Sequence, residues 1–258
     1  MAPHKLKREE QVMSNTRTRW EKGALLYYEA PHRQRIVDAF GKNVTKQIPN
    51  WGAAGYVTAT GTLSMPFINT VTEAGAGETT VVPQGDGTLL ITADIADYDG
   101  ANIQMVGSPF KLLAGSPLYC GARIKINDAT QTDLLFGLCS EDTALMAVAG
   151  AHATDVAYGC YFSKLDGATT GLFTTENNTT ETNVAAFTCG TAWTWYEFFA
   201  EDATTVKAFV NGVYVGQSTT NLPTTALTLS FNFRAGEVTN VKTCYIDGAY
   251  AVQLCPKA

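Results

Sequence analysis

The sequence predicts an all-β protein, an antiparallel β-sandwich or barrel that follows an extended, largely irregular N-terminal arm. Three observations lead to this prediction. The 258 residues include 35 Thr and 23 Gly, so residues that favour strands and turns outnumber those typical of helical proteins. From residue 56 onward, short apolar runs recur between clusters of Gly, Asn, Asp and Thr. No strand–helix alternation of the kind that builds a parallel sheet is present.

The arm, residues 1–54, lacks strand alternation. Pro31 is suited to open a short helix in which Ile36, Val37 and Phe40 share a face, with Gly41 at the C-cap position. Such a helix is too short to be stable alone in water. The aromatic and aliphatic residues here are too many for a linker and too few for a core, so we expect an arm that packs onto something else.

The body, residues 55–258, begins with alternation over 56–63 and a Gly-rich stretch at 73–87 that is typical of a loop. One short helical turn is expected at 142–146. The pair Asn211-Gly212 is the strongest hairpin signal, because both residues accept the positive φ of a type I′ turn. The runs that predict strands are 88–95, 118–127, 134–139, 157–165, 171–175, 184–187, 193–200, 206–210, 213–216, 227–234 and 243–252.

The balance of charge also changes near the boundary between the arm and the body. Residues 1–50 hold ten Lys and Arg against five acids, which leaves eight basic and nineteen acidic residues in the remaining 208. A basic arm on an acidic body points to a partner: nucleic acid, an acidic protein surface or the body of a neighbouring copy. Nucleic acid is not expected, because acids interrupt the basic residues. No apolar run reaches the roughly 20 residues of a membrane span, and the start MAPHKLKREE leads into no signal-peptide core.

Catalytic and metal-binding patterns are not found, and we expect no catalytic residue, cofactor or metal. The three histidines His4, His32 and His152 have no zinc-ligand spacing. The six cysteines contain no C-x-x-C pair and lie mostly inside apolar runs, which favours buried thiols over disulfides. They are Cys120, Cys139, Cys160, Cys189, Cys244 and Cys255.

Carboxylates were compared with the two-acid arrangement of glycosidases. Glu197 and Glu201 have the i, i+4 spacing of one strand face, but Phe199 stands between them, so we expect solvent-facing acids on a half-exposed strand. The acids of 94–99 do not match a calcium loop and predict an Asp-rich turn. The aromatic run at 193–199 covers both strand faces, so one face is expected in the core and the other at an oligomer interface or a sugar platform.

The C-terminal third resembles a concanavalin A-like (laminin G-like) jelly roll. The segments that carry the resemblance are WTWYEFF (193–199), VKAFVNGVYV (206–215), LTLSFNF (227–233) and YIDGAYAV (245–252). That fold includes lectins, glycosidases and structural modules, so it implies an architecture and leaves function open.

The whole layout also resembles capsid decoration (cement) proteins of tailed phages. The resemblance implies a non-enzymatic virion protein made in the host cytoplasm, which binds the major capsid protein shell on its exterior and forms a homo-oligomer, for example a trimer. Aromatic and Arg side chains commonly dominate interface energy. The residues expected to dock the arm are Arg17, Arg19, Trp20, Tyr27, Tyr28, Arg33 and Arg35. The alternative function is a carbohydrate-binding, lectin-like module for attachment to a host or surface.

Overall fold

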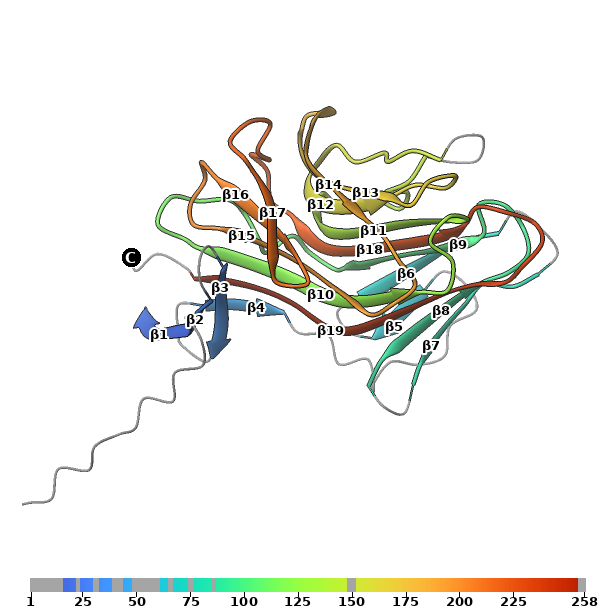
Figure 1. Ribbon diagram of the computed structural model, residues 1–258, viewed down its shortest axis with the longest axis horizontal. Coiled ribbons are helices and arrows are strands. Elements are labelled where there is room, and N and C mark those ends of the chain that lie inside the picture. The colour runs from blue at the N-terminus through green and yellow to red at the C-terminus, as the bar shows by residue number, and fades with distance from the viewer. Residues whose placement is uncertain are drawn as a thin grey trace, which may run out of the picture.

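A computed structural model describes residues 67–254, except 74–76, 85–86 and 148–151, together with five strands nearer the N-terminus. The earlier strands are Thr16–Glu21 (β1), Ala24–Glu29 (β2), Arg33–Asp38 (β3), Val44–Gln47 (β4) and Gly61–Ser64 (β5). Two antiparallel sheets stack face to face (Figure 1). Within the described residues there is no helix, and so none that is long and apolar enough to cross a membrane.

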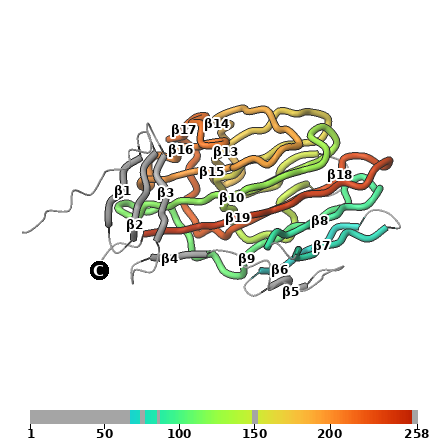
Figure 2. Tube along the Cα trace, turned by 60° about the horizontal axis from the view of Figure 1, so that its bottom comes forward, coloured from blue at the N-terminus to red at the C-terminus, as the bar shows by residue number. Residues whose placement is uncertain are grey.

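Sheet I has the strand order β17-β16-β15-β10-β19-β8-β7, and β4 also pairs with β19. Its long strands β10 and β19 run side by side along the sandwich (Figure 2). β8 pairs with the first half of β19 and β4 with its last four residues, 251–254. The bounds are Thr80–Pro83 (β7), Leu89–Ala93 (β8), Leu118–Ile126 (β10), Thr194–Ala200 (β15), Val206–Val210 (β16), Val213–Ser218 (β17) and Lys242–Leu254 (β19).

Sheet II has the order β14-β13-β12-β11-β18-β9-β6-β5. The bounds are Phe67–Thr72 (β6), Gly100–Met105 (β9), Thr132–Cys139 (β11), Tyr158–Lys164 (β12), Thr170–Asn177 (β13), Thr180–Thr188 (β14) and Thr228–Ala235 (β18). All eleven runs predicted to be strands are therefore confirmed, with ends that shift by a few residues. The all-β antiparallel sandwich predicted from the sequence is also confirmed.

The core fills the space between the sheets with alternate residues of nearly every strand. Its centre is aromatic: Phe162 contacts Phe173 with ring centroids 4.8 Å apart, and Phe173 contacts Phe198 of the opposite sheet at 5.7 Å. The aromatic run at 193–199 supplies Tyr196 and Phe198 to this core. Burying such rings makes a large favourable contribution to the folding free energy.

The hairpin predicted at Asn211-Gly212 joins β16 to β17, with φ values of 49° and 77°. Three strands of the body were not anticipated. Thr80–Pro83 forms an edge strand inside the stretch expected to be a loop, and β6 and β9 come from runs that were not predicted to be strands. The helical turn expected at 142–146 is absent, because backbone groups in that segment bond to other parts of the fold.

Part of the N-terminal arm is more regular than its sequence pattern indicated. β1, β2 and β3 form a separate three-stranded antiparallel sheet. The short helix expected over Ile36 and Val37 is wrong, because both lie in β3, where bonds to a neighbouring strand replace those of an isolated helical turn. Phe40 and Gly41 lie outside the described residues.

Candidate functional site

One loop crosses the outer face of sheet II, the face turned away from the core. We call this loop, residues 140–157 between β11 and β12, the strap; it is described over 140–147 and 152–157. Leu145, Met146 and Val156 of the strap pack on a small apolar cluster that is separate from the main core. The sheet residues in that cluster are Leu135, Cys139 and Tyr161. The strap thus excludes water from strands whose outward residues would otherwise be exposed.

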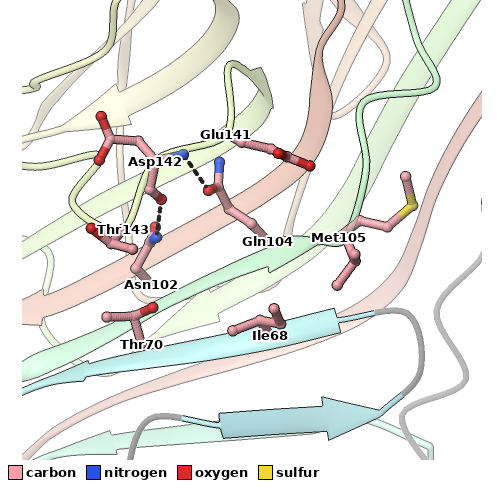
Figure 3. A pocket seen from close by; sticks show the side chains of 9 residues that line it. Ile68, Thr70, Asn102, Gln104, Met105, Glu141, Asp142 and Thr143 are labelled. Atoms are coloured by element: carbon pink, nitrogen blue, oxygen red, sulfur yellow. Dashed lines mark hydrogen bonds between the residues drawn. The ribbon is translucent and has the colours of Figure 1, made fainter.

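Two amide side chains of β9 hold the start of the strap (Figure 3). Gln104 donates from Nε2 to the Ser140 carbonyl at 3.0 Å and accepts at Oε1 from the Asp142 N–H at 2.8 Å. Asn102 donates from Nδ2 to the Asp142 carbonyl at 2.9 Å. Both amides are nearly fully buried, so these bonds satisfy groups that would be costly to leave unpaired.

A groove of about 290 Å³ lies where this part of the strap meets β6 and β9 of sheet II. Its floor is apolar, and its walls carry hydroxyl, amide and carboxylate groups. The lining residues are Ile68, Thr70, Asn102, Gln104, Met105, Val106, Glu141, Asp142 and Thr143. The volume is at the lower end of the roughly 300–1,000 Å³ typical of small-molecule sites.

The charges lining the groove are all negative. Glu141 and Asp142 are exposed, and the nine lining residues include no Lys, Arg or His. Ile68 is 42% exposed and Val106 is 53% exposed, so the groove presents aliphatic surface to solvent. A ligand that combines several hydroxyl donors with apolar C–H surface therefore matches the groove, whereas an anionic ligand would face repulsion.

The carboxylate pair considered from the sequence is not a site. Glu197 is fully buried on sheet I, where its Oε1 accepts hydrogen bonds from the Tyr119 hydroxyl and, at 3.2 Å, from the Tyr250 hydroxyl. The expectation of a solvent-facing Glu197 is therefore wrong, because β10 and β19 bring two tyrosines over it. Glu201 is exposed, just beyond the end of β15.

The outward aromatic residues near the start of β15 are half-buried. Trp193 lies under the Arg123 guanidinium, whose Cζ is 4.7 Å from the ring centroid, and Arg123 also pairs with Asp247 at 3.1 Å. Trp195 contacts Tyr250 with centroids 6.0 Å apart. The Trp193 ring has a cation on one face, so this surface offers less area for stacking a sugar than the sequence pattern alone indicated.

Five cysteines are free and buried, as the sequence predicted, and Cys255 lies outside the described residues. Burial raises the pKa of the Cys120 and Cys139 thiols well above the ordinary value, which makes both poor nucleophiles. Among the residues described, no group of three or more His, Cys, Asp or Glu is placed to hold a metal ion.

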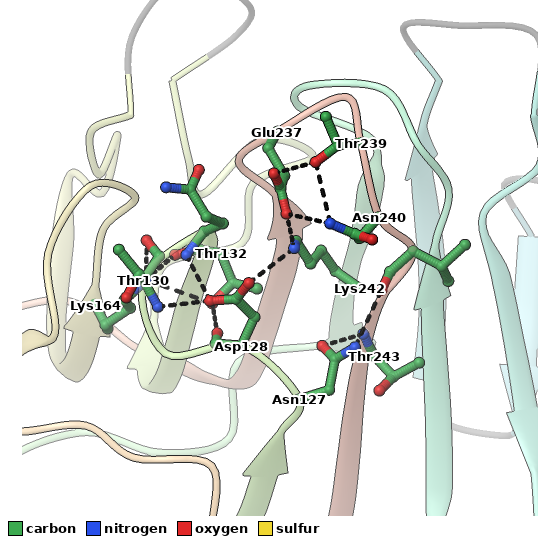
Figure 4. Close-up of polar contacts among 12 residues, drawn as sticks. Asn127, Asp128, Thr130, Thr132, Lys164, Glu237, Thr239, Asn240, Lys242 and Thr243 are labelled. Atoms are coloured by element: carbon green, nitrogen blue, oxygen red, sulfur yellow. Dashed lines mark hydrogen bonds and ion pairs between the residues drawn. The ribbon is translucent and has the colours of Figure 1, made fainter.

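Two buried lysines tie together loops at one end of the sandwich (Figure 4). Lys242 pairs with Asp128 at 2.8 Å and with Glu237. Lys164 donates to the Thr130 and Thr132 carbonyls at 2.9 and 2.5 Å. Burial would raise the pKa of Asp128, but hydrogen bonds from Lys242 and from the Gln131 and Thr130 backbone outweigh it and lower that pKa to about 2. We infer that these contacts stabilise the fold.

The residues expected to dock the arm all lie on the three-stranded sheet. Arg17 in β1 is opposite Tyr28 in β2, and Tyr27 is opposite Arg35 in β3. The remaining three, Arg19, Trp20 and Arg33, lie on the same strands. The backbone pairing thus brings together residues from three separate segments, and their side chains lie outside what the structure describes.

No protein-family model and no curated protein sequence matches the chain. Solved structures do match. An endo-1,3-β-glucanase from Streptomyces sioyaensis is 15% identical with a TM-score of 0.57, and the match covers 85% of this chain and 100% of that one. The Emp46p carbohydrate recognition domain in its potassium-bound form is 7% identical with a TM-score of 0.51, covering 73% and 88%. At these identities the matches show the fold, a concanavalin A-like jelly-roll sandwich.

Proposed function

We propose that this chain is a non-catalytic carbohydrate-binding protein whose ligand lies in the groove between strands β6 and β9 of sheet II and the strap. The observation that carries the proposal is the groove itself: hydroxyls, amides and two carboxylates around the apolar side chains of Ile68, Met105 and Val106. A sugar ring presents hydroxyl donors at its rim and C–H groups on its faces, and so complements both kinds of surface.

The charge of the groove narrows the ligand class. Because the nine lining residues include Glu141 and Asp142 and no cationic side chain, neutral glycans are favoured over sulfated, uronic or sialylated ones. The fold is compatible with this role, since a carbohydrate recognition domain is among the matching structures. The groove is small, which favours a short glycan or the end of a longer one.

A glycan array with neutral, amino and acidic oligosaccharides tests the proposal, with β-1,3-linked glucose oligosaccharides as the first probe because a matching structure is an endo-1,3-β-glucanase. We expect micromolar-to-millimolar binding of neutral sugars. Glu141→Gln should weaken binding at least about fivefold, because hydrogen bonds to a charged acceptor are strong. Glu201→Gln, an exposed acid on the other sheet, is the matched control.

Three results would contradict the proposal. The absence of binding to every glycan on the array would refute the proposed function. Binding that Glu141→Gln leaves unchanged would exclude the groove as the binding site. Release of shortened products from bound oligosaccharides, lost in the same variant, would replace the binding function by a hydrolytic one.

The second candidate is the capsid decoration role. One observation supports this role: the seven Arg, Trp and Tyr residues expected to dock the arm lie on one three-stranded sheet that is separate from the two sheets of the sandwich. In this proposal the three-stranded sheet docks on the major capsid protein shell, and the jelly roll forms a homo-oligomer on the capsid exterior.

Truncation tests this second role. Because β4 pairs with β19, the deletion should end before Val44 so that the sandwich keeps its hydrogen bonds. We expect a chain lacking residues 1–42 to remain folded and to lose co-sedimentation with phage capsids. Full occupancy of capsids by the truncated chain would refute this role.

A further inference from the structure

The later part of the strap is held by a histidine placed among three aspartates. His152 Nδ1 lies 2.8 Å from Asp133 Oδ2, and its Nε2 lies 3.4 Å from Asp97 Oδ1 and 3.8 Å from Asp166 Oδ2. The ring stacks on Tyr98 with centroids 4.6 Å apart and an angle of 14° between planes. The aspartates come from three different segments, so one side chain of the strap contacts the loop before β9, the strand β11 and the loop after β12.

Asp133 is the fixed centre of this cluster. It is fully buried, and Arg234 of β18 donates to its Oδ2 at 2.9 Å. Arg234 also donates from its other terminal nitrogen to the Ala147 carbonyl of the strap at 2.6 Å. The buried Asp133–Arg234 pair therefore holds both described parts of the strap, the earlier part at Ala147 and the later part at His152.

The geometry distinguishes the two charge states of His152. An ionised carboxylate only accepts hydrogen bonds, so Nδ1 carries a proton toward Asp133. In the neutral ring, Nε2 then presents a lone pair toward Asp97 and Asp166, which is unfavourable. In the imidazolium ring, Nε2 presents a proton to both carboxylates instead.

One further cation acts on this cluster. Lys164 of β12, which is 1% exposed, interacts electrostatically with Asp133 and Asp166. Arg234 and Lys164 together leave one negative charge uncompensated among the three aspartates, and a proton on His152 balances it. Histidine is the side chain that ordinarily changes charge between about pH 5 and 8.

The strap couples this cluster to the groove. Its two halves pair with each other, since the Ala147 N–H donates to the Ala153 carbonyl at 2.8 Å and the Asp155 N–H donates to the Leu145 carbonyl at 2.9 Å. The first half continues back to Glu141, Asp142 and Thr143, which line the groove. Loss of the contacts at His152 therefore loosens the hairpin that carries one wall of the groove.

We propose that His152 is a positioning residue for the groove: when protonated it fastens the strap to Asp97, Asp133 and Asp166, and so strengthens ligand binding at mildly acidic pH. The ligand part of this inference rests on the proposed carbohydrate-binding function, whereas the fastening of the strap does not.

The experiment uses the full chain with His4→Gln and His32→Gln, which leaves His152 as the only histidine. Hydrogen exchange of strap peptides, corrected for the intrinsic pH dependence, is measured without ligand at pH 5.5 and pH 7.5. Affinity for the oligosaccharide bound on the array is measured at the same two pH values. We expect protection and affinity to be about fivefold higher at pH 5.5, near the lower end of typical coupling between sites.

Two variants separate protonation from simple packing. His152→Gln should abolish the pH dependence of strap protection, and Asp97→Asn, at a partly exposed side chain, should reduce it while leaving the buried Asp133–Arg234 pair intact. The proposal is overturned if the protection of the strap does not change with pH, or if it changes as much in His152→Gln as in the chain that keeps His152. This holds whether or not the chain binds a glycan. If the protection of the strap depends on pH but the chain binds no glycan, the role of His152 in holding the strap is supported. Only the proposed carbohydrate-binding function is then refuted.

Discussion

Neutralising Asp128 tests the balance of charges around Lys242. Asp128 Oδ2 is 2.8 Å from Lys242 Nζ, and Asp128 Oδ1 accepts the backbone N–H groups of Thr130 and Gln131 at 2.8 and 2.9 Å. Asp128→Asn keeps a carbonyl acceptor for the two backbone groups and removes the charge. Lys242, 2% exposed, is then left with Glu237 as its partner.

The size of the effect follows from the pKa of Asp128. A carboxyl held at about 2 rather than the ordinary 3.8 stabilises the folded state by about 2 kcal/mol above pH 4. Because 30% of the side chain is exposed, solvent screening lowers the expected loss in Asp128→Asn to about 1–2 kcal/mol. A lowered pKa in the folded state means that this stabilisation is lost as the pH falls from about 4 toward 2.

Urea denaturation at pH 7 and at pH 3 measures both features. We expect Asp128→Asn to lower the free energy of unfolding at pH 7, and the difference from the wild-type chain to shrink at pH 3. Asp202→Asn is the matched control: Asp202 also accepts from a turn, at Thr204, but it forms no ion pair among those described, and Lys207 acts on it only at longer range. A change under about 0.5 kcal/mol is expected. Equal stability of Asp128→Asn and wild type at pH 7, or a loss independent of pH, would refute the reasoning.

Three further predictions concern the sandwich. Phe198→Ala, at a fully buried ring between the sheets, should cost about 3–5 kcal/mol in urea denaturation, and a loss below about 1 kcal/mol would contradict its place in the core. Cys120 and Cys160 should resist alkylation in the native chain and react after unfolding, as followed by mass spectrometry; rapid native labelling would disagree with their burial. Gly212→Ala, at φ 77°, should lower stability by about 1 kcal/mol, whereas Gly190→Ala, with open space around its Cβ position, should not.

The strands that alternate in sequence were predictable because one face of each meets the core and the other does not. β9 was not recognised as a strand, although apolar and polar residues alternate over 101–105. All six of its residues, Gly100–Met105, are buried, including the polar Asn102 and Gln104. One face packs in the core and the other lies beneath the strap, where backbone groups satisfy the amides. The alternation of β9 therefore marks a core face and a polar face, and the burial of the polar face depends on the strap, whose position only the tertiary structure decides.

The candidate site could not be found from sequence spacing. The groove joins β6 and β9 to a loop some 40 residues further along the chain, and its polar residues belong to no short motif. His152 was recognised only as a histidine without zinc spacing, since its partners Asp97, Asp133 and Asp166 lie up to 55 positions away in the chain. Glu197 was placed in solvent because nothing near it in sequence indicates the tyrosines of β10 and β19.

By itself, the sequence determined the sandwich, most of its strands, the Asn211-Gly212 hairpin and the buried thiols, because these depend on local propensity and on the period-2 burial of strands. Only the tertiary structure decided which polar groups meet: the strap on Gln104, the three aspartates around His152 and the burial of Glu197. Hydrogen bonds and ion pairs form between groups a few ångströms apart in space, and in a sandwich of long-range strand pairings that proximity is set by register and loop path rather than by neighbours in the chain.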